Sequence, residues 1–152
     1  MIKIMLIGKS GCGKTSFIQA IHNQQLQYKK TQAIEVVDNC IDTPGEFLEL
    51  RSLYRALVVT SCECDLIILC QDCSDERNFF PPSFSSMFAK PIIGMVLKTD
   101  IGTAEEIEKA KDCLAHAGAK EVFEVSNVSR TGIDNVIEHL KGVETCMLKK
   151  IN

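Results

Sequence analysis

The sequence predicts a doubly wound α/β domain with a mainly parallel sheet. Short apolar runs of strand length alternate with longer segments of helical periodicity along the chain. This alternation favours parallel strands joined by right-handed crossovers, with helices on both faces of the sheet. The length of 152 residues fits one domain, expected over 1–152. In this fold class, ligands bind at the carboxyl ends of the strands.

The first half of the chain predicts a strand, a helix, a paired strand region and a second helix. Residues 2–8 form a continuous apolar run, and 14–24 place Phe17, Ile18 and Ile21 at helical spacing. Asp38 and Asn39 favour a turn, so 31–37 and 40–45 are expected to form a short hairpin or one bulged strand. Helical spacing then covers 47–63.

The second half continues the alternation. Buried strands are expected at 65–72 and 91–100, a helix at 104–118 that stops at Gly118, a strand at 121–126 and a closing helix at 131–150. Residues 73–90 interrupt the pattern, because adjacent prolines and four serines favour a loop. Its phenylalanines can plug a sheet face that no helix covers, or form an exposed patch for a protein partner. These are Phe79, Phe80, Phe84 and Phe88.

Charge and composition exclude several classes of protein. A net charge of −3 and a sequence pI of about 5.6 argue against nucleic acid or anionic membrane as partner. No apolar window reaches the length of a membrane span, so a cytoplasmic protein is expected. The eight cysteines are then expected to be reduced. The spacing of Cys62 with Cys64 and of Cys70 with Cys73 also suits a metal, although small apolar residues on a helix end and a buried strand are the simpler interpretation.

The segment GKSGCGKT, residues 8–15, fits the phosphate-binding pattern G-x-x-x-x-G-K-[ST]. It follows a predicted strand and opens a predicted helix, which is the context that the pattern requires. Gly8 and Gly13 are expected to supply unusual backbone torsions, Lys14 to reach the β- and γ-phosphates, and Thr15 to bind Mg²⁺. The nucleotide-binding residues expected here are Gly8, Lys9, Ser10, Gly11, Cys12, Gly13, Lys14, Thr15 and Ser16.

A second motif, IDTPGE at residues 41–46, follows a short apolar run. Asp42 at the end of a strand suits a carboxylate that holds Mg²⁺, and Gly45 suits a backbone N–H that senses the γ-phosphate. Alone, DTPG would be an ordinary turn. Its position 27 residues after Thr15 in an alternating α/β pattern favours the magnesium interpretation.

These motifs resemble the translation-factor-related small GTPases of Ras-like type and, more closely, the EutP/PduV family of ethanolamine and propanediol utilisation proteins. The resemblance covers GKSGCGKT, YKKTQAI, IDTPGEFLELRSLYRAL, PIIGMVLKTD and SNVSRTGIDNV. It implies a P-loop NTPase in which Thr31 covers Mg²⁺, although Thr31 also suits an ordinary strand position. Glu46 stands where such proteins commonly have the glutamine that orients water, so slow hydrolysis is expected. With Lys14 and Gly45, Thr31 and Glu46 complete the expected catalytic set.

The base-binding segment departs from the GTPase pattern [NT]KxD, because LKTD begins with Leu97. Lys98 and Asp100 match, and Ser126 and Asn127 match the loop that approaches the base. Loss of one polar contact weakens guanine preference by at most about tenfold, so GTP/GDP and ATP/ADP both remain candidates. An asparagine at position 97 is expected to restore a base contact.

The resemblance leaves three functions open. One is a GTPase-like protein serving a bacterial microcompartment, with shell proteins as candidate partners. Another is an acetate kinase, and the third is a scaffold that binds nucleotide without turning it over. A kinase needs a cation beside the γ-phosphate for the acetate carboxylate, and Arg51 with Arg55, expected one helical turn apart, or Lys29 with Lys30 could supply it. A solvated basic face is the simpler interpretation of these residues.

Overall fold

A six-stranded sheet forms the centre of the protein in a computed structural model that describes residues 2–22, 35–37 and 39–151. The strand order is β2-β3-β1-β4-β5-β6, and every neighbouring pair is parallel except β2 and β3. The strands are β1 (Ile4–Gly8), β2 (Glu35–Val37), β3 (Cys40–Asp42), β4 (Leu66–Asp72), β5 (Ile92–Leu97) and β6 (Val122–Glu124). The mainly parallel sheet is confirmed, and β2 with β3 forms the hairpin.

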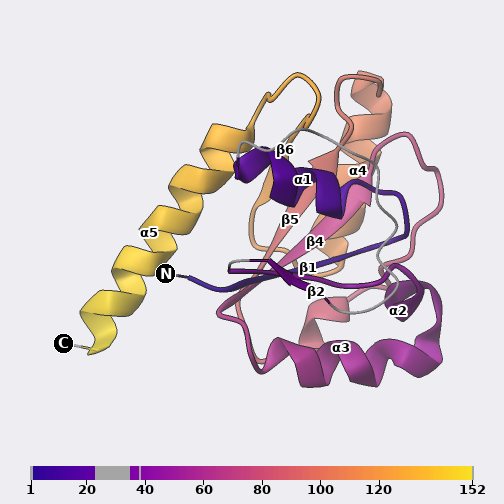
Figure 1. The fold of residues 1–152 in the computed structure, drawn as a ribbon. Helices are drawn as coiled ribbons and strands as arrows, with labels where there is room; N and C mark the ends of the chain where they lie inside the picture. The colour runs from indigo at the N-terminus through magenta and orange to yellow at the C-terminus, as the bar shows by residue number, and fades with distance from the viewer. Residues whose placement is uncertain (1, 23–34, 38, 152) are drawn as a thin grey trace.

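Helices cover both faces of this sheet (Figure 1). α1 (Lys14–Ile21) and α5 (Ile133–Ile151) pack on one face, whereas α3 (Tyr54–Ser61) and α4 (Ala104–His116) pack on the other. β1 shows why both faces must be covered: Ile4 and Leu6 belong to the first hydrophobic cluster, and Met5 and Ile7 belong to the second. The last turns of α5 extend beyond the sheet (Figure 1).

The register of the parallel strands brings their carboxyl ends to one edge. Gly8 at the end of β1 is level with Cys70 in β4, and Asp72 is level with Leu97 at the end of β5. Asp42 at the end of β3 is level with Leu6. The segments that follow these strands therefore meet at the same edge, where ligands bind in this fold class.

The helix expected over 47–63 is wrong as one element. The structure has α2 (Glu46–Glu49), a 3₁₀ turn η1 (Arg51–Leu53) and α3. Leu50 breaks the helix with φ −109° and ψ 111°, and 53% of its surface is exposed. Helical spacing alone did not reveal this break, since Leu50 carries an apolar side chain at a helical position without packing in the core. Arg51 and Arg55 consequently do not lie one turn apart on a common helix.

Residues 73–90 form the expected loop, with only a short 3₁₀ turn η2 (Phe84–Met87). Phe80, Phe84 and Phe88 are buried in the cluster beneath α3 and α4. The Phe84 ring lies 5.4 Å from each of the other two, centroid to centroid. The plug interpretation is confirmed for these three. Phe79 remains half-buried.

The other expected ends are also observed. Thr103 and Glu106 form a capping box at the start of α4, and Gly118 follows its end with φ 107°. No helix among the described residues has the length and apolar character to cross a membrane. Within the same residues there is no group of three or more His, Cys, Asp or Glu side chains that could hold a metal ion. Cys64, Cys70 and Cys73 are buried, whereas Cys62 is exposed.

Candidate functional site

The phosphate loop, residues 8–15, joins β1 to α1 through a turn that depends on its glycines. Gly11 and Gly13 have φ of 79° and 112°, which side chains with a Cβ rarely adopt. Gly8 differs from the expectation, because its constraint is space and not a positive φ. A Cβ at Gly8 would lie 2.7 Å from both Cys12 Sγ and the Cys70 carbonyl oxygen.

The side chain of Lys14 lies against the backbone of the phosphate loop. Its Nζ donates to the carbonyl oxygens of Gly8 at 2.6 Å and Lys9 at 3.0 Å. Among the residues that the structure describes, it is the one lysine or arginine classed as buried, with 6% of its surface exposed. A buried ammonium therefore lies against the backbone of the loop, where it can serve an anion.

Two distant segments also hold the loop through its carbonyl groups. Lys98 Nζ donates to Gly11 O at 2.8 Å, and Asn127 Nδ2 donates to Gly13 O at 3.2 Å. Lys98 also forms an ion pair with Asp72 at 2.8 Å. The carbonyls of Gly8, Lys9, Gly11 and Gly13 thus accept from protein donors. Anion binding uses backbone N–H groups, so this arrangement suits a phosphate cradle.

Thr15 and Asp42 meet beside the loop, although 27 positions separate them. Thr15 Oγ1 donates a hydrogen bond to Asp42 Oδ2. Asp42 is buried, and its neighbour Thr43 donates to Leu6 O at 2.7 Å, which fixes the end of β3 against β1. A hydroxyl and a carboxylate are hard oxygen donors of the kind that Mg²⁺ prefers. The pair therefore fits the metal that the sequence predicts.

The DTPG turn packs directly on the loop. A Cβ at Gly45 would overlap the backbone nitrogen of Ser10, so only glycine fits there without movement. Glu46 begins α2 and is partly exposed. Glu49, at the end of the same helix, accepts a hydrogen bond from Ser10 N at 3.2 Å. The structure thus brings Gly45 to the phosphate loop, and it adds Glu49, which sequence reasoning missed.

The two segments expected to bind the base, 97–100 and 126–127, lie side by side. The side chain of Leu97, however, is part of the hydrophobic core. Leu97 has 0% of its surface exposed and belongs to the core beneath α1 and α5. Asp100 is exposed, and its Oδ1 accepts from Ser126 Oγ at 2.8 Å. Thr99 N donates to Val125 O at 3.3 Å, which joins the two segments. Asn127 has a buried Oδ1 that accepts no hydrogen bond within the described ranges.

A charged cluster on the segment after β4 was also missed from sequence. Asp75 accepts from Arg77 Nε at 3.1 Å and Nη2 at 3.1 Å, and it forms an ion pair with Lys9 of the phosphate loop. Arg77 foremost holds the pKa of Asp75 well below its usual range, and Lys9 acts in the same direction. The sequence did contain a signal for this cluster, because three consecutive charged residues, 75–77, follow the buried strand β4.

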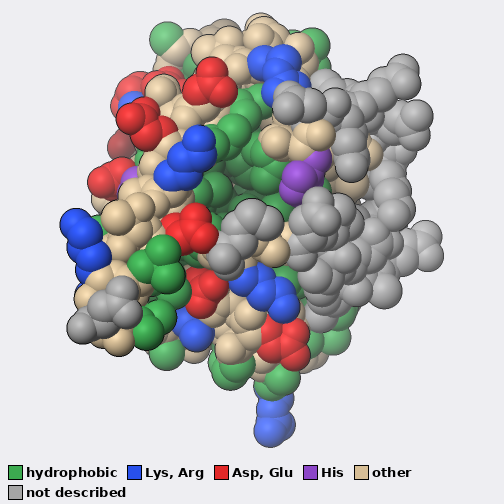
Figure 2. Space-filling view, turned by 60° about the vertical axis from the view of Figure 1, so that its left-hand side comes forward, with side chains coloured by type: hydrophobic (Ala, Val, Ile, Leu, Met, Phe, Trp, Pro, Cys, Tyr) green, Lys and Arg blue, Asp and Glu red, His purple; other side chains and the backbone are tan. Residues whose placement is uncertain are grey.

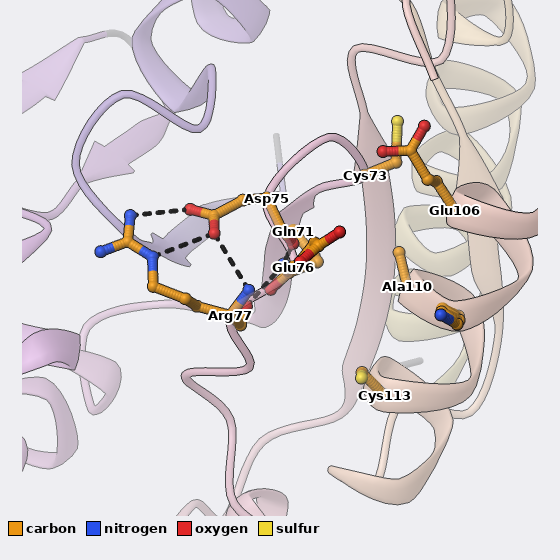
Figure 3. A pocket seen from close by; sticks show the side chains of 9 residues that line it. Gln71, Cys73, Asp75, Glu76, Arg77, Glu106, Ala110 and Cys113 are labelled. Carbon is orange, nitrogen blue, oxygen red and sulfur yellow. Dashed lines mark hydrogen bonds and ion pairs between the residues drawn. The ribbon is translucent and has the colours of Figure 1, made fainter. Parts of the chain in front are cut away.

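Gln71 fixes the backbone of this segment. Its buried amide donates to the carbonyl oxygens of Asp72, Asp75 and Arg77 at 3.2, 3.4 and 3.3 Å. Figure 3 shows Asp75 and Arg77 facing each other, on the side of the segment away from Glu106 of α4. A pocket of about 320 Å³ separates the segment from that helix.

The remaining residues expected at the site lie in α1, outside the described residues or on the exposed surface. Ser16 lies in the first turn of α1. Thr31, Lys29 and Lys30 lie outside the described residues. Arg51 and Arg55 are exposed, and within the described chain no hydrogen bond or ion pair is found for the side chain of either.

A second hollow lies at the opposite end of β1 from the phosphate loop. Its volume is about 340 Å³, and its walls include Ile4, Ile21, Ile137 and Leu140 (Figure 2). Its walls also include the polar residues His22, Asn39, Lys141 and Glu144. It is separate from the candidate site.

Comparison with known proteins gives one family. The model of the family "Ethanolamine utilisation - propanediol utilisation" (PduV-EutP) matches residues 1–142. The chain is 41% identical to the propanediol utilization protein PduV of Citrobacter freundii, over 99% of this chain and 100% of the relative. It is 28% identical to the probable acetate kinase EutP of Escherichia coli K12 and to that of Salmonella typhimurium, over 92% of this chain and 89% of each relative.

The family match covers the phosphate loop, the DTPG turn, the LKTD segment and the Ser126–Asn127 pair, all of which the fold brings to one edge of the sheet. The resemblance to the EutP/PduV family noted from the sequence is thereby confirmed, and so is the α/β fold consistent with a P-loop NTPase. The chain belongs to the PduV-EutP family of ethanolamine and propanediol utilisation proteins.

Proposed function

We propose that this protein is a magnesium-dependent P-loop nucleotide-binding protein of GTPase-like type that serves ethanolamine or propanediol utilisation and its bacterial microcompartment. The observation that carries the proposal is the hydrogen bond between Thr15, at the end of the phosphate loop, and Asp42, at the end of β3. Lys14 would hold the β- and γ-phosphates, and the N–H groups of the loop and of α1 would hold their oxygens. This assignment uses residues on two separate segments of the chain, 8–21 and 40–42.

The metal site would consist of the Thr15 hydroxyl and Asp42. A bound Mg²⁺ would neutralise charge on the phosphate oxygens. Asp42 is positioned for this by the pairing of β3 with β1, and Thr15 by the start of α1. Thr31 remains a candidate third ligand from the sequence.

The terminal phosphate would lie toward Ser10 and Gly45. Gly45 lies against Ser10 without room for a side chain, so its backbone N–H can approach the same phosphate that the loop holds. Glu46 follows directly. An ionised glutamate accepts hydrogen bonds but donates none, and it repels phosphate charge, which supports slow hydrolysis.

Asp100 would select the base. Ser126 Oγ donates to one of its oxygens, which orients the carboxylate at an exposed position. A carboxylate accepts paired N–H donors such as those of guanine, whereas adenine offers no such pair. Leu97 contributes no polar contact, so ATP remains a candidate nucleotide.

A second candidate function is an acetate kinase, which Glu46 favours and which two relatives carry in their names. An oxygen of the acetate carboxylate would form a bond to the γ-phosphorus of ATP as the bond to the β,γ-bridging oxygen breaks. ADP leaves with that electron pair, and acetyl phosphate is formed. The acceptor is already an anion at neutral pH, so no proton has to be removed. A glutamine or a general base to activate water is therefore not needed.

Two measurements on the full chain test these proposals. Titration of GTP, GDP, ATP and ADP with Mg²⁺ should give binding that weakens when the metal is chelated. Binding of no nucleotide would contradict the first proposal. Incubation with ATP, Mg²⁺ and acetate, followed by hydroxylamine trapping, should give acetyl phosphate if the kinase candidate is right. Absence of product at saturating acetate would remove the kinase and leave hydrolysis or a nucleotide-dependent scaffold.

A further inference from the structure

The mouth of the phosphate loop near Ser10 is where an acceptor for the γ-phosphoryl group must arrive. Ser10 is the third residue of the loop, and Gly45 lies directly against it. Phosphoryl transfer needs the attacking and leaving oxygens roughly in line with phosphorus. The acceptor must therefore lie on the far side of the γ-phosphate from the rest of the nucleotide, next to Gly45 and Ser10.

Two cations lie beside the corner that Ser10 and Gly45 form, and they share one carboxylate. Lys9 pairs with one oxygen of Asp75, and Arg77 contacts both oxygens. Asp75 neutralises only one of the two positive charges. Arg77 has 66% of its side chain exposed, so its guanidinium is open to a second anion.

The structure holds Arg77 in place through groups that have no catalytic task of their own. Gln71 Nε2 donates to the backbone of Arg77, and Asp75 accepts from Arg77 N at 3.0 Å. The ring of Phe79 lies 5.2 Å from the Arg77 guanidinium carbon and 5.7 Å from Lys9 Nζ. A preorganised guanidinium loses less entropy on binding a carboxylate than a mobile one.

A carboxylate of the chain itself already lies at this corner. Glu49 Oε1 accepts from Ser10 N at 3.2 Å, and both Asp75 and Glu49 raise the pKa of Arg77, with Asp75 the stronger cause. With Lys9, Asp75, Arg77 and Glu49 together, the formal charges sum to zero. Exchange of Glu49 for another carboxylate would preserve this balance.

We propose that Arg77 and the backbone N–H of Ser10 form the binding site for the carboxylate of the phosphoryl acceptor, and that Glu49 occupies the Ser10 N–H until the acceptor displaces it. This rests on the kinase candidate above and names its acceptor site. One acetate oxygen is held by Arg77 and the Ser10 N–H while the other forms the bond to phosphorus, and the β,γ-bridging oxygen departs on ADP with the electron pair of the broken bond. Arg77 thus orients the nucleophile, and it replaces Arg51 and Arg55 as the expected cation.

The first test compares Arg77→Ala, Arg77→Lys and wild type in the acetyl phosphate assay. Arg77→Ala should raise the KM for acetate by roughly ten- to a hundredfold, the magnitude of a bond between charged groups. The KM for ATP and the affinity for nucleotide should change little. Arg77→Lys keeps the charge but loses the bidentate geometry, so it should lie between the two. Lys109→Ala, at a side chain 76% exposed on α4, is the matched surface control.

The second test uses Glu49→Ala, which removes the competing carboxylate. The KM for acetate should fall severalfold with the KM for ATP unchanged, because acetate no longer has to displace a side chain. A purely structural role for the cluster predicts the opposite, since loss of Glu49 would then loosen the corner and weaken acetate binding. Thermal unfolding of each variant verifies that the fold is retained.

The outcomes separate the acceptor site from the kinase activity. Acetyl phosphate formation in wild type, with an unchanged acetate KM in Arg77→Ala, would overturn the acceptor site and leave the kinase intact. An acetate KM raised in Arg55→Ala and not in Arg77→Ala would overturn it in favour of the other cation. No product from wild type with intact nucleotide binding would remove the kinase and the acceptor site together. A raised acetate KM in Arg77→Ala and a lowered one in Glu49→Ala would support the site.

Discussion

The hydroxyl of Thr15 donates to Oδ2 of Asp42 and so joins the first turn of α1 to the end of β3. This bond links two motifs that sequence analysis treats separately. Because Asp42 is buried and β3 pairs with β1, the carboxylate has little freedom to leave the phosphate loop. The two oxygens are therefore expected to act together on one metal.

Thr15→Ala should make nucleotide binding nearly independent of Mg²⁺. Loss of one ligand oxygen is expected to cost at least about tenfold in metal affinity, a magnitude typical of disturbed metal sites. Isothermal titration with and without EDTA measures this. Thr15→Ser keeps the hydroxyl and serves as the control. Equal magnesium dependence in Thr15→Ala and wild type would contradict the metal assignment.

Lys14→Ala should abolish or strongly weaken nucleotide binding while the fold is kept. The ammonium is expected to hold phosphate oxygens, and in the protein alone it satisfies the carbonyls of Gly8 and Lys9. Its loss leaves those two acceptors to water, so a decrease of about 1–3 kcal/mol in the free energy of unfolding is expected. Fluorescent nucleotide titration and urea unfolding measure the two effects. Nucleotide affinity equal to that of the Lys109→Ala control would rule out the phosphate role.

Leu97→Asn should destabilise the protein and leave the base preference nearly unchanged. From sequence alone, an asparagine here is expected to restore a base contact. The structure replaces that expectation, because Leu97 is fully buried in the core beneath α1. Burial of an amide in place of a leucine costs about 1–3 kcal/mol when it finds no partner.

Chemical denaturation and the ratio of GTP to ATP affinity check this prediction. Leu97→Met, which roughly conserves volume, is the control for packing. A rise in guanine preference without loss of stability would show that position 97 faces the nucleotide.

The free energy of unfolding of Asp75→Asn should fall less steeply at acid pH than that of wild type. Arg77 and Lys9 lower the pKa of Asp75 in the folded protein. Its stabilising contribution is therefore complete above the unfolded pKa of about 3.9 and is lost as the pH falls below that value. Wild type should be more stable than Asp75→Asn at pH 7, and the difference should shrink between pH 4 and pH 2.

Urea unfolding across this range provides the measurement. Glu105→Gln is the matched control, because that carboxylate is 82% exposed. A difference between wild type and Asp75→Asn that stays constant with pH would contradict the coupling of Asp75 to its two cations.

Cys64 and Cys62 should react very differently although they are two positions apart. Burial raises the pKa of Cys64 to about 11, whereas Cys62 is exposed. The thiolate is the reactive form, so iodoacetamide at pH 8 should label Cys62 quickly and Cys64 only after unfolding. Peptide mass spectrometry over time follows both. Labelling at equal rates would mean that Cys64 is not buried as described.

Much of the fold could be predicted because the apolar runs and the helical periodicity agree along most of the chain. The break at Leu50 could not, since a helical pattern does not reveal whether an apolar residue finds a core to pack against. The orientation of Leu97 was also hidden. In a run such as 92–97, every residue is apolar, so the side of the sheet that each one faces depends on pairing with neighbouring strands.

Part of the candidate site could likewise be predicted from the sequence, and part could not. The phosphate loop and DTPG are local patterns whose residue types follow from phosphate and magnesium chemistry, so spacing along the chain suffices to find them. Lys9, Glu49, Asp75 and Arg77 come from three segments, and only tertiary structure brings them to one corner. Asn127 was expected near the base, and the structure adds a hydrogen bond from its side chain to the phosphate loop, which spacing along the chain does not reveal.

The central position of β1 in the sheet has a consequence for synthesis on the ribosome. β1 is made before both of its neighbours in the sheet, β3 and β4. The loop after it is tied by Lys98 and Asn127, which follow their partners by 87 and 114 positions. A nascent chain that already contains all of GKSGCGKT lacks these ties until synthesis has passed residue 127. Competence to capture a nucleotide is therefore acquired only after the segments around Lys98 and Asn127 have left the exit tunnel, long after the loop itself.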